Sequence, residues 1–257
     1  MYKFHIQTVQ ITNFKTIVEA LKDVLVDAPM EIDSSGIRIT AVDPTQTILV
    51  YLRLGSSNFE TYNCPEKVVL GINMYLFFKI IKTSNPGDTL TFYMDNDDVN
   101  TLGIRIQNSE KNFDIDFKMG LMDLNGETIN IPPTKFDFVM TMLSQDFTKM
   151  CRDYNQFGNT LDIKCTGRQV CFGIQGDGIS STFTINEGNS DSGLKFKQTP
   201  NEDKIIQGLF DLKHLVLFNK CTPLSSNVEL YLKNDYPLII RYVLQLGDLK
   251  LVLAPKE

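Results

Sequence analysis

Asp114 and Asp116 are spaced for general acid/base chemistry. They lie two residues apart in a segment that alternates like a β-strand, so their side chains share one face. A working acid/base site also needs a positioned histidine or a second carboxylate pair, and the sequence shows neither beside them. We therefore predict a protein that is not an enzyme, with an unrecognised carboxylate site at this pair as the alternative.

The sequence also contains no complete motif for binding a metal or a cofactor. Asp95-Asn-Asp-Asp98 begins like a calcium loop, but Asn100 stands where glycine is needed and Ile106 where glutamate is needed, so we interpret it as a hairpin turn. The five cysteines form no C-x-x-C pair, and no glycine-rich phosphate loop occurs. The sequence thus predicts no cofactor and no metal site. It also predicts reduced thiols, with Cys165 and Cys171 facing each other across a hairpin.

Alternation typical of β-strands dominates the chain. Apolar, β-branched and aromatic residues at a period of two predict strands at 4–10, 36–41, 47–54, 89–94, 101–107, 136–142, 161–165, 169–174, 179–185, 204–210, 228–232, 238–244 and 249–253. Four segments show the apolar spacing of amphipathic helices instead. They begin near Asn13, Asn73, Ser144 and Asp211. The expected N-caps are Thr12, Asn73 and Asp211, and the expected inner face of the second helix is Leu76, Phe77, Ile80 and Ile81.

The helices are spaced as an internal repeat, because the second pair follows the first by about 131 and 138 residues. Between the halves lies a passage without periodicity, in which Pro132-Pro133 prevents a helix or a central strand. The predicted fold is α+β, with two similar strand-rich domains of two helices each. The domains span residues 1–120 and 137–257, joined by a connector at 121–136.

Each predicted helix carries two basic residues at a spacing of three or seven, which places both on one side of the helix. The pairs are Lys15 and Lys22, Lys79 and Lys82, Lys149 and Arg152, and Lys213 and Lys220. Basic side chains also keep helices soluble, so a single pair would carry little meaning. Repetition on four helices of a chain with net charge −6 instead favours one positive surface in a negative shell.

Length and composition bound the class of protein. With 257 residues, 42% of them hydrophobic, the chain can bury the core of one large domain or of two ordinary ones. No apolar run reaches the roughly 18 residues of a membrane span, and the N-terminal residues lack a signal-peptide core. We therefore expect an intracellular protein without membrane contact.

Eight short motifs are spread along the chain. In order they are Glu19-Ala-Leu-Lys-Asp23, Asp33-Ser-Ser-Gly36, Gly71-Ile-Asn73, Leu121-Met-Asp-Leu124, Cys151-Arg-Asp153, Thr222-Pro-Leu-Ser-Ser226, Pro237-Leu238 and Leu253-Ala-Pro-Lys256. In this order and spacing they resemble the proliferating cell nuclear antigen family of DNA sliding clamps over essentially the whole length.

The resemblance implies a closed head-to-tail ring of three identical subunits that encircles double-stranded DNA. Such a ring is a processivity factor, which tethers DNA polymerase and other replication and repair enzymes. Its helices line the hole, so the eight basic residues named above would face phosphates without reading bases. At the ring seam, the strand around Asn112 to Lys118 would pair with the strand around Ile179 to Ile185 of the next subunit. A clamp-fold factor acting as a monomer or within a heterotrimer is the alternative.

The resemblance also implies a pocket for a short helical peptide with apolar and aromatic plugs, carried by polymerases, the clamp loader and other enzymes. The matching residues are Val42, Gln46, Thr47, Leu49, Ile129, Ile131, Pro132, Phe136, Pro237, Val252, Ala254 and Pro255. Val252 stands where the family commonly has an aromatic residue, Thr47 is more polar than usual, and Pro133 adds stiffness. These departures predict a shifted peptide preference.

The cellular setting follows from the same resemblance. A clamp works in the nucleus, or in a viral replication compartment if a virus encodes it, and the divergence of this chain is compatible with a large DNA virus or a distant eukaryote. Gly167-Arg168 occupies the turn in which eukaryotic relatives carry a modifiable lysine, although Lys164 is near.

Overall fold

The computed structural model describes residues 2–124, 129, 134–187, 194–201 and 203–256. These residues separate into two compact units. The first comprises Met1–Gln46, Val50–Ile129 and Leu244–Leu249, and the second comprises Thr47–Leu49, Asn130–Val243 and Lys250–Glu257.

The first unit is built from two antiparallel sheets and two helices. Its elements are β1 (Tyr2–Thr8), α1 (Ile11–Leu21), β2 (Asp27–Asp33), β3 (Gly36–Val42), β4 (Ile48–Gly55), a 3₁₀ turn (Ser56–Asn58), β5 (Thr61–Asn63), β6 (Val68–Asn73), α2 (Met74–Lys82), β7 (Thr89–Asp95), β8 (Thr101–Asn108) and β9 (Phe113–Gly120). One sheet has the order β5-β1-β7-β8-β9, and in the other β6, β2, β3 and β4 are successive neighbours.

The second unit repeats this plan. Its elements are β10 (Phe138–Leu143), α3 (Ser144–Tyr154), β11 (Thr160–Thr166), β12 (Gln169–Gly176), β13 (Ile179–Asn186), β14 (Lys195–Gln198), β15 (Ile205–Asp211), α4 (Leu212–Phe218), a 3₁₀ helix (Asn219–Leu224), β16 (Asn227–Leu232), β17 (Leu238–Val243) and β18 (Gly247–Leu253). The neighbours run β14-β10-β16-β17-β18 in one sheet and β13-β12-β11-β15 in the other.

The predicted α+β repeat is therefore confirmed at the level of strand order. In the part of the chain that the structure describes, each unit reads strand, helix, five strands, helix, three strands. Equivalent strands also occupy equivalent places in the sheets, so β9 corresponds to β18, and β4 to β13. None of the helices in the described ranges is long and apolar enough to span a membrane.

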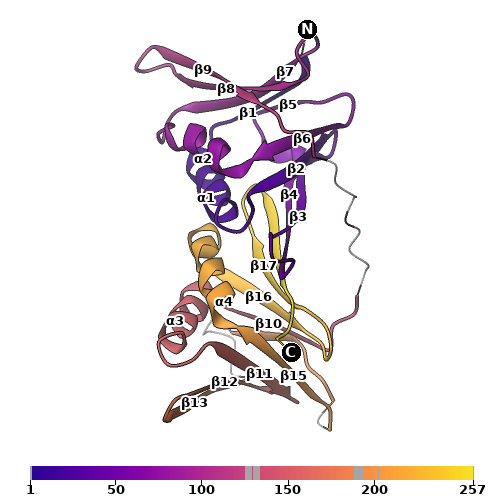
Figure 1. Ribbon diagram of the computed structural model, residues 1–257, viewed down its shortest axis with the longest axis vertical. Helices are drawn as coiled ribbons and strands as arrows, with labels where there is room; N and C mark the ends of the chain where they lie inside the picture. The colour runs from indigo at the N-terminus through magenta and orange to yellow at the C-terminus, as the bar shows by residue number, and fades with distance from the viewer. Residues whose placement is uncertain (1, 125–128, 130–133, 188–193, 202, 257) are drawn as a thin grey trace. The chain divides into compact units, whose positions relative to one another are not determined.

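The helices of each unit lie side by side (Figure 1). Their buried residues are mostly apolar. In the first unit, Phe14 of α1 meets Phe77 of α2 edge-on at 6.2 Å, and both rings contact Phe92 of β7. Such aromatic clusters contribute beyond the area they bury. The apolar spacing that predicted the helices thus corresponds to a real core.

The helix ends follow the predicted caps with one exception. Asn73 accepts a hydrogen bond from Leu76 N, and Asp211 accepts one from Lys213 N, so both predicted N-caps are confirmed. Thr12 as a cap is wrong. α1 already begins at Ile11, two residues before the predicted start, because the Ile11 side chain is buried, and its N-cap position has no side-chain hydrogen bond.

The predicted inner face of α2 is confirmed at Phe77 and Ile81, is half-buried at Ile80 and is wrong at Leu76. Leu76 is 48% exposed, whereas Met74 and Phe78, with Phe77 and Ile81, are buried. The helix is turned slightly from the orientation that its apolar residues suggested, because nearly every residue of this segment is apolar and periodicity alone cannot choose among them.

Four strands have no counterpart among the predicted ones: β2, β5, β6 and β14. In β2, Pro29 argues against a strand in the sequence, but it pairs with Gly71 of β6 and leaves the ladder on either side intact. The two thiols predicted to face each other do not. Cys165 pairs with Val170 and is buried, while Cys171 pairs with Lys164, since the register places the cysteines on opposite faces.

Gly103 of β8 offers a direct test of packing in the first unit. A Cβ atom at this position would lie 2.3 Å from Cζ of the buried Tyr93 ring, so Gly103→Ala must displace that ring. We expect a loss of about 1–3 kcal/mol of unfolding free energy, visible as a lower midpoint in thermal denaturation. Gly120→Ala, on β9 with no atom within 4 Å, is the control and should leave the midpoint unchanged. Equal midpoints for the two variants would contradict this packing of Gly103 against Tyr93.

Candidate functional site

The basic residues predicted to share a function all lie on or directly after the helices. Lys15 is on α1, Lys22 caps its C-terminus, and Lys79 and Lys82 are on α2. In the second unit, Lys149 and Arg152 are on α3, Lys213 is on α4, and Lys220 is in the following 3₁₀ helix. Six of these cations are exposed, whereas Lys15 and Lys22 are half-buried.

The cations of the first unit differ in how accessible they are. Lys15 Nζ donates to the carbonyl oxygens of Lys82 and Ser84 at 3.1 and 3.3 Å, where it stabilises the C-terminal end of α2. Lys22 lies 4.9 Å above the Phe78 ring and 2.6 Å from Asp23. Lys79 and Lys82, in contrast, are exposed. Lys15 and Lys22 therefore support the helix pair, and the exposed cations are the ones open to a large anion.

In the second unit all four of these cations are exposed, and Lys149 and Lys213 form ion pairs. Arg152 is exposed on α3, and Lys149 forms an ion pair with Asp153 at 2.6 Å, one helical turn away. The hydrogen bond to Asp153 raises the pKa of Lys149, so the ammonium group stays charged. Lys213 lies 3.2 Å from Asp211, the N-cap of α4. These exposed pairs contribute little to stability, which leaves the cations available to exchange partners.

The paired carboxylates share one face of β9, as predicted, but they do not form an acid/base site. Arg105 Nε lies 3.8 Å from Asp114 Oδ1 and 3.7 Å from Asp116 Oδ1. The Tyr93 hydroxyl donates to Asp116 at 2.8 Å, and burial together with this hydrogen bond raises the pKa of Tyr93. Lys118 is paired with Asp95 at 3.1 Å. The arrangement is an ion-pair network that ties β7, β8 and β9 together.

The turn Asp95-Asn-Asp-Asp98 is a hairpin turn between β7 and β8, as predicted. Asp98 N donates to the Asp95 carbonyl oxygen at 3.3 Å, and the Asp98 carboxylate accepts from Asn100 N and from the Thr101 hydroxyl. The side-chain oxygens of Asp98 therefore serve the turn itself.

Two strands end their sheets and carry exposed apolar residues. β9 is the last strand of its five-stranded sheet, with Ile115 42% exposed, and β13 is the last strand of its four-stranded sheet. On β13, Ile179 and Phe183 are 41% and 43% exposed. A strand edge with exposed apolar side chains is a template for pairing with another strand.

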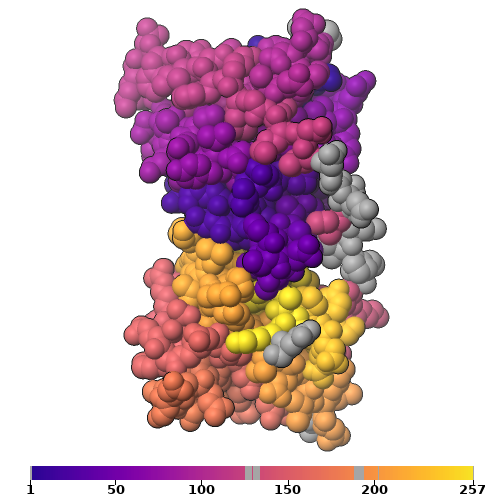
Figure 2. Space-filling view, in the orientation of Figure 1, coloured from indigo at the N-terminus to yellow at the C-terminus, as the bar shows by residue number. Residues whose placement is uncertain are grey.

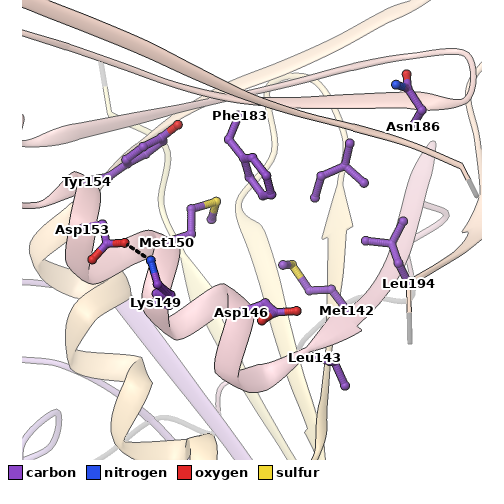
Figure 3. Close-up of a pocket in the computed structure, with 11 residues that line it drawn as sticks. Met142, Leu143, Asp146, Lys149, Met150, Asp153, Tyr154, Phe183, Asn186 and Leu194 are labelled. Carbon is purple, nitrogen blue, oxygen red and sulfur yellow. Dashed lines mark hydrogen bonds and ion pairs between the residues drawn. The ribbon is translucent and has the colours of Figure 1, made fainter. Parts of the chain in front are cut away.

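A hollow of about 460 Å³ lies beside β13 in the second unit. Met142, Met150, Tyr154, Phe183, Ile185 and Leu194 contribute its apolar lining. Figure 3 shows the Phe183 ring directed toward Met150 and Met142, with the Lys149–Asp153 ion pair at the rim. Apolar side chains on an edge strand thus continue into an apolar hollow behind it.

The residues that the resemblance assigns to a peptide pocket are distributed over both units. In the first, Val42 at the end of β3 is 43% exposed, Gln46 is exposed with a positive φ of 57°, and Ile129 is half-buried. Ile131 and Pro132 lie outside the described residues.

In the second unit, several of these residues do lie close together. Leu49 and Val252 are half-buried between fully buried neighbours, so both point to the outer face of their strands. The Thr47 carbonyl oxygen accepts from Ala254 N at 3.0 Å, and Pro255 follows, exposed. The next residue, Lys256, donates its backbone N–H to Leu209, so the C-terminal residues lie at the surface against β15 (Figure 2).

Phe136 and Pro237 are the remaining residues of the second unit that the resemblance assigns to the peptide pocket. The Phe136 ring meets Tyr231 and Tyr236 edge-on at 5.5 and 5.6 Å, and Pro237 follows Tyr236 in the chain. The Thr134 and Tyr236 hydroxyls are 2.9 Å apart. The end of the connector is therefore fastened to the second unit, as its start is fastened to the first by the bond from Met122 N to Gly71. Sequence reasoning missed Tyr231 and Tyr236, because only the tertiary fold brings them to Phe136.

Comparison with known proteins covers both units. The sequence matches two family models, described as proliferating cell nuclear antigen, N-terminal domain, over residues 1–128, and proliferating cell nuclear antigen, C-terminal domain, over residues 130–257. It is also 35% identical over 256 residues to a protein of Paramecium bursaria Chlorella virus 1 named "Probable DNA polymerase sliding clamp 1". That alignment covers 98% of this chain and 96% of the relative.

Proposed function

Because the chain belongs to the proliferating cell nuclear antigen family, we propose that it is a DNA sliding clamp. Three copies form a closed ring around double-stranded DNA and tether DNA polymerase and other replication and repair enzymes. The protein acts as a processivity factor and not as an enzyme, in the nucleus or in a viral replication compartment. The domains of the proposal are residues 1–120 and 137–257, with the connector at 121–136.

The observation that carries the proposal is the repetition of cations on or directly after all four α-helices of the described residues, in a chain with net charge −6. Lys79, Lys82, Lys149, Arg152, Lys213 and Lys220 are the proposed main phosphate contacts. Lys15 and Lys22 add charge from half-buried positions. Attraction of this kind depends on salt and is indifferent to base sequence, which suits a protein that must slide.

We place the ring seam between β9 of one copy and β13 of the next. The support is that both strands are sheet edges and both expose apolar residues, Ile115 on one and Phe183 on the other. The two edges differ, so the contact is head-to-tail and closes only as a ring. The hollow beside Phe183 would take an aromatic side chain of the incoming β9, for which Phe113 and Phe117 are available.

Partner enzymes and the clamp loader would dock through short helical peptides at the residues assigned to the pocket. Leu49 and Val252, on the outer face of the second unit, and the aromatic group at Phe136 support this assignment. The name of the viral relative couples a sliding clamp to DNA polymerase, which makes a polymerase the first partner to test.

The experiment that tests the proposed function is polymerase extension on a primed circular template, with and without a clamp loader. We expect the protein to lengthen the products made in one binding event, and we expect the effect to disappear when the template is linearised, since a ring slides off a free end. A matched reaction without the clamp is the control. Stimulation that survives linearisation would contradict encirclement, and no stimulation with any loader would contradict the proposed function.

A further inference from the structure

The outward face of α2 contains an aromatic residue among its cations. Tyr75, Lys79 and Lys82 are spaced i, i+4 and i+7, which aligns them along one side of the helix. The opposite side is buried through Met74 and Phe77. Tyr75 is 56% exposed, and Lys79 Nζ lies 4.5 Å from the centre of its ring.

The internal repeat gives a second, independent reason to count Tyr75 with the DNA-facing residues. α2 begins directly after its cap Asn73, and α4 begins directly after its cap Asp211. Tyr75 and Lys213 are therefore both the second residue of equivalent helices. Lys213 is one of the proposed phosphate contacts. The first unit therefore has an aromatic ring at the position where the second unit of the same chain has a cation.

An exposed tyrosine beside lysines has a recognisable use. Surfaces that hold single-stranded nucleic acid combine cations for the phosphates with aromatic rings on which bases stack. Duplex DNA does not offer its base faces, because they are stacked on each other, so a ring adds nothing to sliding on a duplex. The charge of the neighbouring Lys79 and Lys82 points to an anionic ligand and not to an apolar protein surface.

We propose that Tyr75 and Lys79 form a binding site for unpaired bases of single-stranded DNA, such as the template strand beside a primer end. A base stacks on the Tyr75 ring, while Lys79 leaves the ring and pairs with a phosphate. The proposal rests on the proposed function, since it assumes that α2 faces DNA, and it extends that function from duplex sliding to recognition of single-stranded segments.

Fluorescence provides the first test. The chain contains no tryptophan, so Tyr75→Trp creates a single reporter on the ring position. We expect oligothymidylate to quench its emission, and an abasic oligonucleotide of equal length to quench it far less, because the phosphates are present but the bases are not. Leu76→Trp, at the adjacent 48% exposed position, is the matched control and should respond alike to both ligands. Equal quenching of the Tyr75→Trp reporter by the two oligonucleotides would overturn the proposal.

Affinity provides the second test, on variants whose fold is checked by circular dichroism. Tyr75→Ala should weaken oligothymidylate binding at least about fivefold, the factor that corresponds to one lost stacking contact. Tyr75→Phe keeps the ring and Leu76→Ala removes a neighbouring apolar side chain, so both should bind as the unchanged protein does. Tyr75→Ala with unchanged oligothymidylate affinity overturns the proposal. If that variant instead lost polymerase binding, Tyr75 would belong to a protein contact.

The single-strand site and the clamp can fail separately. Processive extension on circular DNA tests the clamp itself and does not require Tyr75. Normal processivity without base-dependent quenching rejects the single-strand site alone. If the protein without any substitution does not stimulate processive extension, the proposed function is rejected.

Discussion

Replacing Phe183 with aspartate should convert the ring into monomers. Phe183 lies on the edge strand β13 with 43% of its surface exposed, and its ring is directed into an apolar hollow. In the proposed seam, the new carboxylate would be buried against the apolar lining of this hollow, where Lys149 at the rim is already paired with Asp153. That costs several kcal/mol, so the dissociation constant of the seam should rise more than about a hundredfold.

Light scattering at micromolar concentration measures this directly. The unchanged protein should form a particle of three times 29.2 kDa, and Phe183→Asp a particle of 29.2 kDa. Val69→Asp is the control, because Val69 is 57% exposed on β6, a strand outside the proposed seam, and this variant should remain trimeric. A Phe183→Asp protein that stays trimeric would show that β13 is not at the seam.

A mixing experiment guards against simple misfolding of that variant. Ile115→Asp on β9 should also be monomeric, but it keeps an intact β13, and Phe183→Asp keeps an intact β9. An equimolar mixture can therefore form one sound seam and should yield a dimer of twice 29.2 kDa. If the mixture contains only particles of 29.2 kDa, a head-to-tail contact between these strands is contradicted.

Replacing Val252 with aspartate should abolish binding of partner peptides and leave the ring intact. Val252 is half-buried on the outer face of β18, between the buried Leu251 and Leu253, so its side chain is not part of the core. Removing an apolar contact from an aromatic plug costs roughly 1.5 to 3 kcal/mol, and an unpaired charge adds to it. We expect peptide affinity to fall by more than about tenfold.

Fluorescence polarisation of a labelled synthetic helical peptide with aromatic plugs is the measurement. Val69→Asp again serves as the control, since it places the same charge on an exposed valine of another strand. Unchanged peptide binding by Val252→Asp would remove β18 from the docking site. A simultaneous loss of the trimer would show instead that the substitution damages the fold.

Much of the fold could be predicted from local patterns. The starts of α2 after Asn73 and of α4 after Asp211 were evident because a cap residue and an apolar spacing coincide there. Strand β2 was not evident, because Pro29 opposes a strand locally and only its pairing with Gly71 compensates. The cap at Thr12 failed for a related reason, since burial of Ile11 outweighs local capping preference.

Some features of the candidate site could likewise be predicted from local patterns, and others could not. The basic residues and their one-sided spacing are properties of single helices, so they can be identified from the sequence by itself. The ion pairs and hydrogen bonds of Asp114 and Asp116 cannot be identified in this way, because Arg105 and Tyr93 reach them from other strands of the sheet. Neither can the exposure of Tyr75, which depends on how α2 is turned against the sheets.

Sequence alone determined the α+β repeat, the helices with their cations and the acidic setting in which those cations stand out, since each of these depends on spacing along the chain. Only the tertiary structure decided which cations are half-buried, which carboxylates form ion pairs and which strands lie at the edge of a sheet. Those properties depend on neighbours far apart in sequence. Register and helix rotation, set by packing of the whole core, select these neighbours.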